Sequence, residues 1–308
     1  MGDIGLMIRC VLIFALCVLS FGRPTSAEPS ERTREFWQGL VASGFELPAG
    51  EKAFDLLVEM HVLLGSPDPV LRDDVAYGAT VRWVYRARLL TADEQTRLVR
   101  IWSANLAKGL RDGRTEDAYR RSFSALNLSV LAALDNEAPF LSSDDFARLV
   151  SDALVYLDAE PDRRGYDAAS GWLHATAHTA DLLKFLARSP KLTTADQARL
   201  FDAVAKACTA SPAFAWGEDE RLAQVLRSLV RRADLDAPMF DTWLARWPAA
   251  HKRLWKDAPR IDPARFAAIQ NVKTTVRAAY VALAADHDLS PASADARQRM
   301  LQMLTTLR

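Results

Sequence analysis

The stretch that indicates the fold of this 308-residue chain most clearly is residues 142–158, SSDDFARLVSDALVYLD. Its apolar residues recur at intervals of three and four: Phe146, Leu149, Val150, Ala153, Leu154 and Leu157. This spacing places them along one face of an α-helix. Ser142 precedes the run, and Asp145 follows three residues later, so a hydroxyl can cap the first turn. The stretch therefore predicts an amphipathic helix over residues 143–158.

The same features recur along most of the chain. Hydroxyl–acid cap pairs stand at Thr91/Glu94 and Thr193/Asp196, and a cap residue precedes a proline at residues 262–263 and 290–291. Long alternating apolar–polar runs and Asn-Gly turns, which would indicate strands, are missing from the sequence. The pattern predicts helices over residues 30–43, 51–64, 69–88, 92–109, 115–134, 143–158, 170–187, 194–209, 217–232, 236–247, 263–285 and 291–307.

The later helices group into pairs. The first members of the pairs begin near residues 69, 115, 170, 217 and 263, a step of roughly 45 to 55 residues, close to the 40–47 of HEAT and armadillo repeats. We therefore predict an all-α protein built as a right-handed α/α superhelix of stacked helical hairpins, HEAT- or armadillo-like. A compact helical bundle is the alternative architecture.

The first 27 residues have the pattern of a secretory signal peptide. Arg9 is followed by the apolar run 10–21, and the small residues 25–27 offer a cleavage site. The run has about a dozen residues, whereas a membrane-spanning helix needs about 20, although an uncleaved anchor is an alternative. The sequence predicts export to the periplasm or medium, with residues 28–308 as a single all-helical domain without a membrane segment. Cleavage leaves Cys208 as the only cysteine, so an internal disulfide is impossible.

The charge balance bears on the class of partner. The chain has 39 Lys and Arg against 39 Asp and Glu, and half of its residues are apolar. This is the composition of an ordinary globular protein with no strong field to attract nucleic acid. The expected partner is an unidentified protein, peptide or small-molecule ligand.

The densest group of polar and aromatic residues lies between Tyr166 and Asp181. On a helix, His174, His178 and Asp181 would fall within about 60° of one another. Two histidines four residues apart and a carboxylate can hold a divalent transition metal, which is the one cofactor the residues suggest. The alternative is that the histidines hydrogen-bond to neighbouring helices and Asp181 orients one of them.

Similar polar clusters stand near the starts of the other first-member helices. Acids in a first turn often serve only the helix dipole, but equivalent positions in a helical stack line one surface. We therefore predict one polar groove. Its expected residues are Arg72, Asp73, Arg120, Arg121, Tyr166, Trp172, His174, His178, Asp181, Glu218, Asp219 and Arg221. A weaker alternative is a glycosidase site. It would draw its carboxylates from Asp158, Glu160, Glu218 and Asp219, with Tyr166, Trp172 and Trp216 stacking on the sugar.

These motifs, in this order, resemble a bacterial family known as domain of unknown function 2785. They are 65–68 (GSPD), 71–74 (LRDD), 120–126 (RRSFSAL), 164–166 (RGY), 171–182 (GWLHATAHTADL) and 218–223 (EDERLA). The resemblance covers roughly residues 50–250. It implies an all-helical, HEAT-like fold and no particular activity.

The function that these observations favour is a binding or scaffold role for a cell-envelope protein that uses its polar groove. A metal-dependent hydrolase with His174, His178 and an acid as ligands is the alternative, and a carbohydrate-active enzyme is a third.

Overall fold

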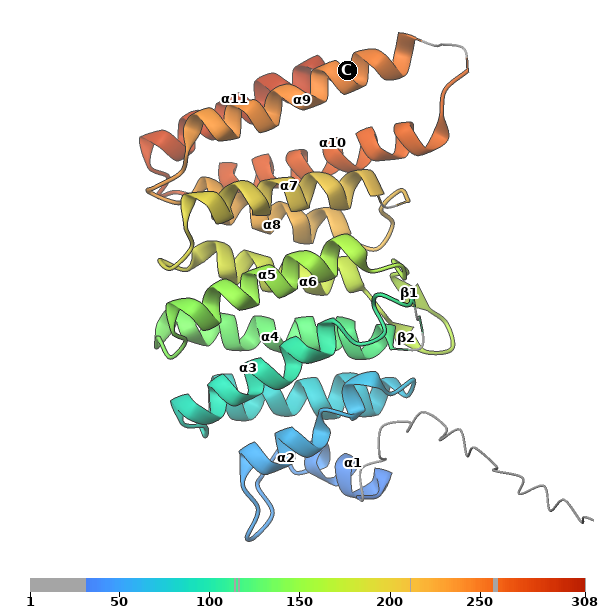
Figure 1. The fold of residues 1–308 in the computed structure, drawn as a ribbon, viewed down its shortest axis with the longest axis vertical. Helices are drawn as coiled ribbons and strands as arrows, with labels where there is room; N and C mark the ends of the chain where they lie inside the picture. The colour runs from blue at the N-terminus through green and yellow to red at the C-terminus, as the bar shows by residue number, and fades with distance from the viewer. Residues whose placement is uncertain (1–31, 114, 116, 211, 257–259, 308) are drawn as a thin grey trace, which may run out of the picture.

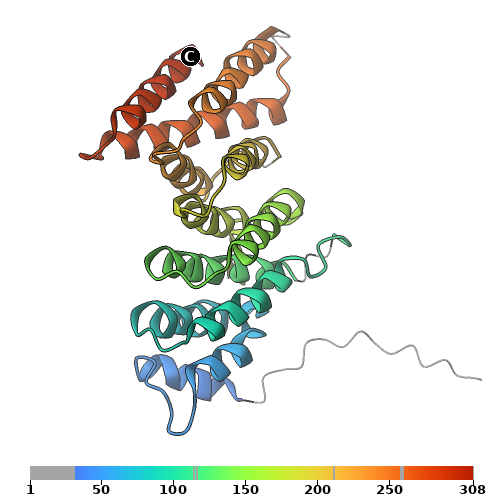
Figure 2. The ribbon, with the colours of Figure 1, turned by 60° about the vertical axis from the view of Figure 1, so that its left-hand side comes forward.

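The computed structural model describes residues 32–113, 115, 117–210, 212–256 and 260–307 (Figures 1 and 2). The predicted signal peptide, residues 1–27, lies outside these residues. The helices are α1 (Arg34–Ala42), α2 (Ala53–Met60), the short η1 (Leu63–Gly65), η2 (Val70–Tyr77), η3 (Thr80–Arg86), α3 (Ala92–Leu106), α4 (Ala118–Glu137), α5 (Ser143–Ala159), α6 (Ala175–Arg188), α7 (Thr194–Ala210), α8 (Glu218–Val230), α9 (Ala237–Lys256), α10 (Pro263–Ala284) and α11 (Pro291–Thr306). The predicted all-α class is confirmed.

The helices lie in successive layers along the long axis of the molecule (Figure 1). One row consists of η2 and η3, then α4, α6, α8 and α10, and each member packs on the next. Helices α3, α5, α7, α9 and α11 form a second row in the same way. This is the order expected from the predicted helical pairs, with the first members side by side. The right-handed superhelical sense stays a prediction.

The predicted apolar stripes form the core between the rows. All six residues of the α5 stripe are buried, as are Leu56, Leu57 and Met60 of α2. Trp83, Trp102 and Trp243 are almost completely buried. The predicted caps are also present: Thr91 and Glu94 form a reciprocal capping box, and Ser142 accepts from the backbone N–H of Asp145. In the described part of the chain, no helix has both the length and the apolar character needed to cross a membrane.

Two helix boundaries differ most from the prediction. Helix α9 runs to Lys256 rather than ending at 247, with Pro248 inside it. The apolar face that includes Trp247 continues to the buried Leu254, so packing favours the longer helix. Helix α6 begins at Ala175 rather than at 170.

A short hairpin takes the place of the first turn predicted for α6. Strands β1 (Tyr166–Asp167) and β2 (Gly171–Trp172) pair antiparallel. Asp167 Oδ1 accepts from the backbone N–H groups of Ala169 and Ser170, and Gly171 has a φ of 74°. These side-chain-to-backbone bonds compete successfully with a helix, because an aspartate and a glycine in this arrangement close a tight turn. The expectation that the mature chain contains no strand is therefore wrong here.

Candidate functional site

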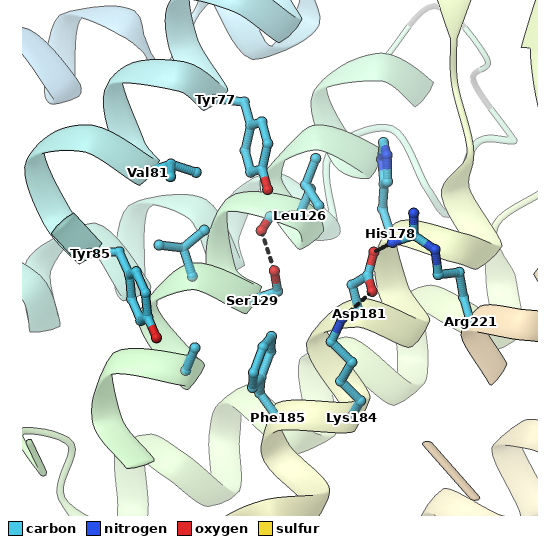
Figure 3. Close-up of a pocket in the computed structure, with 12 residues that line it drawn as sticks. Tyr77, Val81, Tyr85, Leu126, Ser129, His178, Asp181, Lys184, Phe185 and Arg221 are labelled. Atoms are coloured by element: carbon cyan, nitrogen blue, oxygen red, sulfur yellow. Dashed lines mark hydrogen bonds and ion pairs between the residues drawn. The ribbon is translucent and has the colours of Figure 1, made fainter. Parts of the chain in front are cut away.

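A pocket of about 420 Å³ opens on the row of first-member helices (Figure 3). Helices η2 and η3 provide one wall, α4 the floor, and α6 and α8 the opposite wall. The lining residues are Tyr77, Val81, Tyr85, Leu126, Ser129, Val130, Ala133, His178, Asp181, Lys184, Phe185 and Arg221. Helices α4 and α6 contribute most of the lining, at intervals of three or four residues, and η2 and α8 contribute one residue each, so neighbouring layers together form the pocket.

Asp181 forms the charged side of the pocket. Its carboxylate is almost fully buried and accepts from Lys184 Nζ through Oδ1 at 2.6 Å and from Arg221 Nη1 through Oδ2 at 2.5 Å (Figure 3). The side chain of Lys184 is mostly buried, whereas half of the Arg221 side chain is exposed. Two cations against one carboxylate leave one positive charge on the lining.

Aromatic rings form the other walls. Tyr77, Tyr85 and Phe185 face the pocket from η2, η3 and α6 (Figure 3). The Tyr85 hydroxyl donates to Glu137. Burial and the charge of Asp181 raise the pKa of Tyr77, so its hydroxyl stays protonated. Nothing in the described part of the chain hydrogen-bonds to the Tyr77 hydroxyl, which is therefore free to donate into the pocket.

His178 lies on α6 one turn before Asp181 and is largely buried. Its Nδ1 lies 2.8 Å from Ser122 Oγ on α4, and its ring packs edge-on against Phe123. Burial, with the positive charges of Arg221 and Arg72 and the neighbouring His174, lowers the pKa of His178 well below its ordinary value. The imidazole is therefore neutral at physiological pH.

The β1–β2 hairpin is held beside the pocket by a second set of predicted residues. Arg72 is fully buried, donates to the carbonyl oxygens of Ser66 and Ser170, and stacks over the ring of Tyr119. Burial lowers the pKa of Arg72, but the nearby Asp73 counteracts the shift. Arg72 thus fixes the hairpin tip on η2.

An aromatic cluster covers the open end of this hairpin. Tyr166, Trp172 and Trp216 are each partly exposed, with ring centroids 4.9 to 6.0 Å apart. His174 has a φ of 53°, stacks on Trp172 and lies 2.9 Å through Nε2 from the carbonyl oxygen of Trp216. These contacts join the hairpin to the loop before α8.

Arg121 lies deeper in the same layer. Its guanidinium binds both carboxylate oxygens of Glu160, at 2.6 and 2.9 Å, and donates to the carbonyl oxygen of Lys108. Both side chains are fully buried. Burial lowers the pKa of Arg121, but Glu160 outweighs this and raises it overall. The pair is a closed structural contact.

The proposed metal ligands do not share a site. The described residues contain no group of three His, Cys, Asp or Glu side chains arranged to hold a metal ion. His174 is oriented toward Trp216, His178 toward Ser122, and Asp181 toward Lys184 and Arg221. The trio was predicted on the assumption that His174 lies within a helix. It precedes the helix in a left-handed conformation, and although its ring packs edge-on against His178 with centroids 5.7 Å apart, its Nε2 contacts the carbonyl oxygen of Trp216.

The carboxylates considered for sugar chemistry are also separated by their partners. Asp158 on α5 pairs with Lys206 on α7, and both helices belong to the second row, away from the pocket. Glu160 pairs with Arg121. Glu218, the first residue of α8, is buried and accepts from the backbone N–H of Trp216 in the preceding loop. Asp219 accepts from the adjacent backbone N–H of Glu220.

The predicted groove residues thus fall mainly into two regions. His178, Asp181 and Arg221 line the pocket, whereas Arg72, Tyr166, Trp172, His174 and Glu218 belong to the hairpin and its contacts. Arg121 lies apart from both, in its pair with Glu160. Asp73 pairs with Arg72, and Arg120 packs against Gly65. The sequence analysis missed Tyr77, Tyr85, Lys184 and Phe185. Their spacing on the same helical faces as Val81 and Asp181 is the signal that could have found them.

Comparison with known proteins places the chain in a family. The model of the family described as protein of unknown function (DUF2785) matches residues 106–281. The match begins and ends later than the 50–250 expected from the motifs, and it takes in most of α10. No curated protein and no solved structure matches the chain.

Proposed function

The chain belongs to the DUF2785 family, whose function is unknown, and we propose that it binds a small organic anion in the pocket between η2, η3, α4, α6 and α8. The observation that carries this proposal is the surplus positive charge of Lys184 and Arg221 over Asp181 in a pocket with aromatic walls. This proposal assigns the predicted binding role to the pocket and to one class of ligand.

The size of the pocket favours a small molecule over a peptide. Its volume of about 420 Å³ lies in the range of small-molecule sites, roughly 300–1,000 Å³. Such sites combine apolar and aromatic walls with a few polar groups that fix orientation. Leu126, Val130 and Phe185 supply apolar surface, and Tyr77, His178 and Arg221 supply the polar groups.

The charge around the pocket favours an anion. Phe185 lies between two cations, with Lys184 Nζ 4.9 Å and Arg188 Cζ 5.0 Å from its ring centre. Arg188 has no carboxylate partner among the described residues. Its pKa is lowered mainly by burial, and Arg227 and Arg231, which pair with Asp286 and Asp288, add to the shift. Arg188 therefore adds a cation beside the Phe185 ring that no carboxylate of the described residues neutralises.

The donors available to a carboxylate are Arg221 and Tyr77. Half of the Arg221 side chain is exposed and only Nη1 binds Asp181, so other guanidinium N–H groups can bind a ligand. The Tyr77 hydroxyl supplies a neutral donor from the opposite wall (Figure 3). A charged hydrogen bond of this kind contributes about 1.5–3 kcal/mol.

The test uses matched acids and amides. Phenylacetate and hexanoate are compared with phenylacetamide and hexanamide by ligand-observed NMR on the purified protein. We expect each acid to bind at least roughly tenfold more tightly than its amide, from one charge-assisted hydrogen bond. Val81→Trp fills the pocket and should abolish binding, whereas Val281→Trp, the same change at an exposed position on α10, should not. Equal binding of acids and amides, or binding unchanged by Val81→Trp, would contradict the proposal.

We also propose that this binding protein is exported and that its helical pairs form a HEAT-like stack. Export is supported by the apolar run and small residues within 1–27. Mass spectrometry of the full-length gene product, expressed in a bacterial host, should give a chain that begins at Glu28. An intact N-terminus on protein found in the cytoplasm would contradict export.

A further inference from the structure

The protons around Ser122 determine which ring nitrogen of His178, a residue that lines the pocket, carries a lone pair. Ser122 Oγ is fully buried and hydrogen-bonds to the carbonyl oxygen of Leu173 and to Nδ1 of His178, and the Tyr156 hydroxyl, which can donate to it, lies nearby. A serine hydroxyl has one proton to donate. The carbonyl oxygen of Leu173 can only accept, so that proton goes to Leu173.

The remaining contact must then run the other way. Ser122 Oγ accepts, and Nδ1 of His178 carries the proton that it donates across 2.8 Å. In a neutral imidazole with a proton on Nδ1, Nε2 is unprotonated. The lowered pKa of His178 is consistent with the neutral ring. No group in the described part of the chain hydrogen-bonds to Nε2.

The backbone explains why this contact is reliable. Leu173 is held by a hydrogen bond from its N–H to the carbonyl oxygen of Gly165, in the β1–β2 hairpin. The His178 N–H donates to the carbonyl oxygen of His174, so both partners of Ser122 sit on fixed backbone. The hairpin thereby sets the orientation of a side chain in the pocket.

We infer that His178 Nε2 is a fixed hydrogen-bond acceptor in the pocket, so that the ligand is an organic acid that also carries a hydroxyl or amino donor. This inference rests on the proposed function and narrows its ligand class. Arg221 and Tyr77 take the acid group, and His178 takes the donor. A simple acid without a donor displaces water from Nε2 and leaves it unpaired, which costs affinity.

The first measurement needs no ligand. Long-range ¹H–¹⁵N spectra of the ¹⁵N-labelled protein distinguish protonated from unprotonated ring nitrogens, and the His178 signals are identified by their loss in His178→Gln. We expect a proton on Nδ1 and none on Nε2 at neutral pH, and a change in this pattern in Ser122→Ala. A proton on Nε2 in the wild-type protein would overturn the inference whether or not any acid binds.

The second measurement compares mandelate with phenylacetate, which differ by one hydroxyl, using calorimetry. We expect mandelate to bind roughly three- to tenfold more tightly, as one hydrogen bond allows. His178→Leu should remove this preference. His178→Gln, which keeps an acceptor, should retain part of it, and circular dichroism checks that both variants are folded.

The outcomes separate the two proposals. Equal binding of mandelate and phenylacetate by the wild-type protein overturns the inference and leaves the proposed function in place. A mandelate preference that survives in His178→Leu also overturns it. If neither acid nor the hexanoate of the earlier test binds, the proposed function fails and this ligand class fails with it.

Discussion

Two arginine–carboxylate pairs in neighbouring layers show how differently the same residue types can be used. Arg121 and Glu160 are both fully buried, and each charged group is bound by the other or by backbone. Arg221 and Asp181 also pair, but half of the Arg221 side chain is exposed and Lys184 competes for the same carboxylate. The first pair is complete and holds the fold, whereas the second has hydrogen-bonding capacity left for a ligand.

The largest effect is expected at the fully buried pair of Arg121 and Glu160. Arg121→Met leaves Glu160 buried without a counter-ion, which should lower the free energy of unfolding by about 3–5 kcal/mol. Urea denaturation measures this loss. Removing both charges in Arg121→Met/Glu160→Leu should restore much of the stability. Arg246→Met, which breaks an exposed pair with Asp202, should cost less than about 1 kcal/mol. A similar small loss in Arg121→Met would refute the assignment of a structural role.

The next effect concerns the contact between the hairpin and the loop before α8. A Cβ added at Gly165 would lie 2.2 Å from the Trp216 ring, so Gly165→Ala must displace the indole. We expect a loss of about 1–3 kcal/mol in the free energy of unfolding. In Gly165→Ala/Trp216→Gly the indole and its Cβ, which both meet the added methyl group, are removed, so the two costs should be less than additive. Strict additivity in thermal unfolding would show that the two residues do not meet.

A smaller effect follows from the neutral His178. Its pKa is lowered in the folded protein, so the unfolded chain binds a proton more readily. The stability contribution is therefore complete above the ordinary pKa of about 6.5 and is lost as the pH falls below it. Between pH 7.5 and 5.5, the wild-type protein should lose about 1.4 kcal/mol more than His178→Gln. Parallel pH profiles in urea denaturation would contradict a buried, neutral imidazole.

The smallest stability effect is expected at the partly exposed pair of Arg221 and Asp181. Arg221→Met leaves Asp181 paired with Lys184, so the free energy of unfolding should change by about 1 kcal/mol or less. Urea denaturation beside Arg121→Met gives the contrast directly. A loss as large as that of Arg121→Met would mean that both pairs serve the fold.

Periodicity was sufficient to predict most of the helices, because apolar spacing and caps are local in sequence. The α5 stripe and the Thr91 capping box were predicted residue by residue. The site was predicted only in part, because burial depends on contacts between layers. Arg121 and Arg221 look alike in sequence, and only the positions of Glu160 and Asp181 distinguish them. His174, His178 and Asp181 form no metal-binding group among the described residues for a local reason, since Asp167 and Gly171 close a hairpin and place His174 before the helix.

The most direct measurement is the affinity of phenylacetate for the wild-type protein and for Arg221→Met, by isothermal titration calorimetry at constant ionic strength. If Arg221 binds the anion, Arg221→Met should weaken binding roughly tenfold or more, about 1.4 kcal/mol, while the unfolding free energy of the variant changes little. Equal affinities for the two proteins would contradict the assignment of the pocket as an anion site.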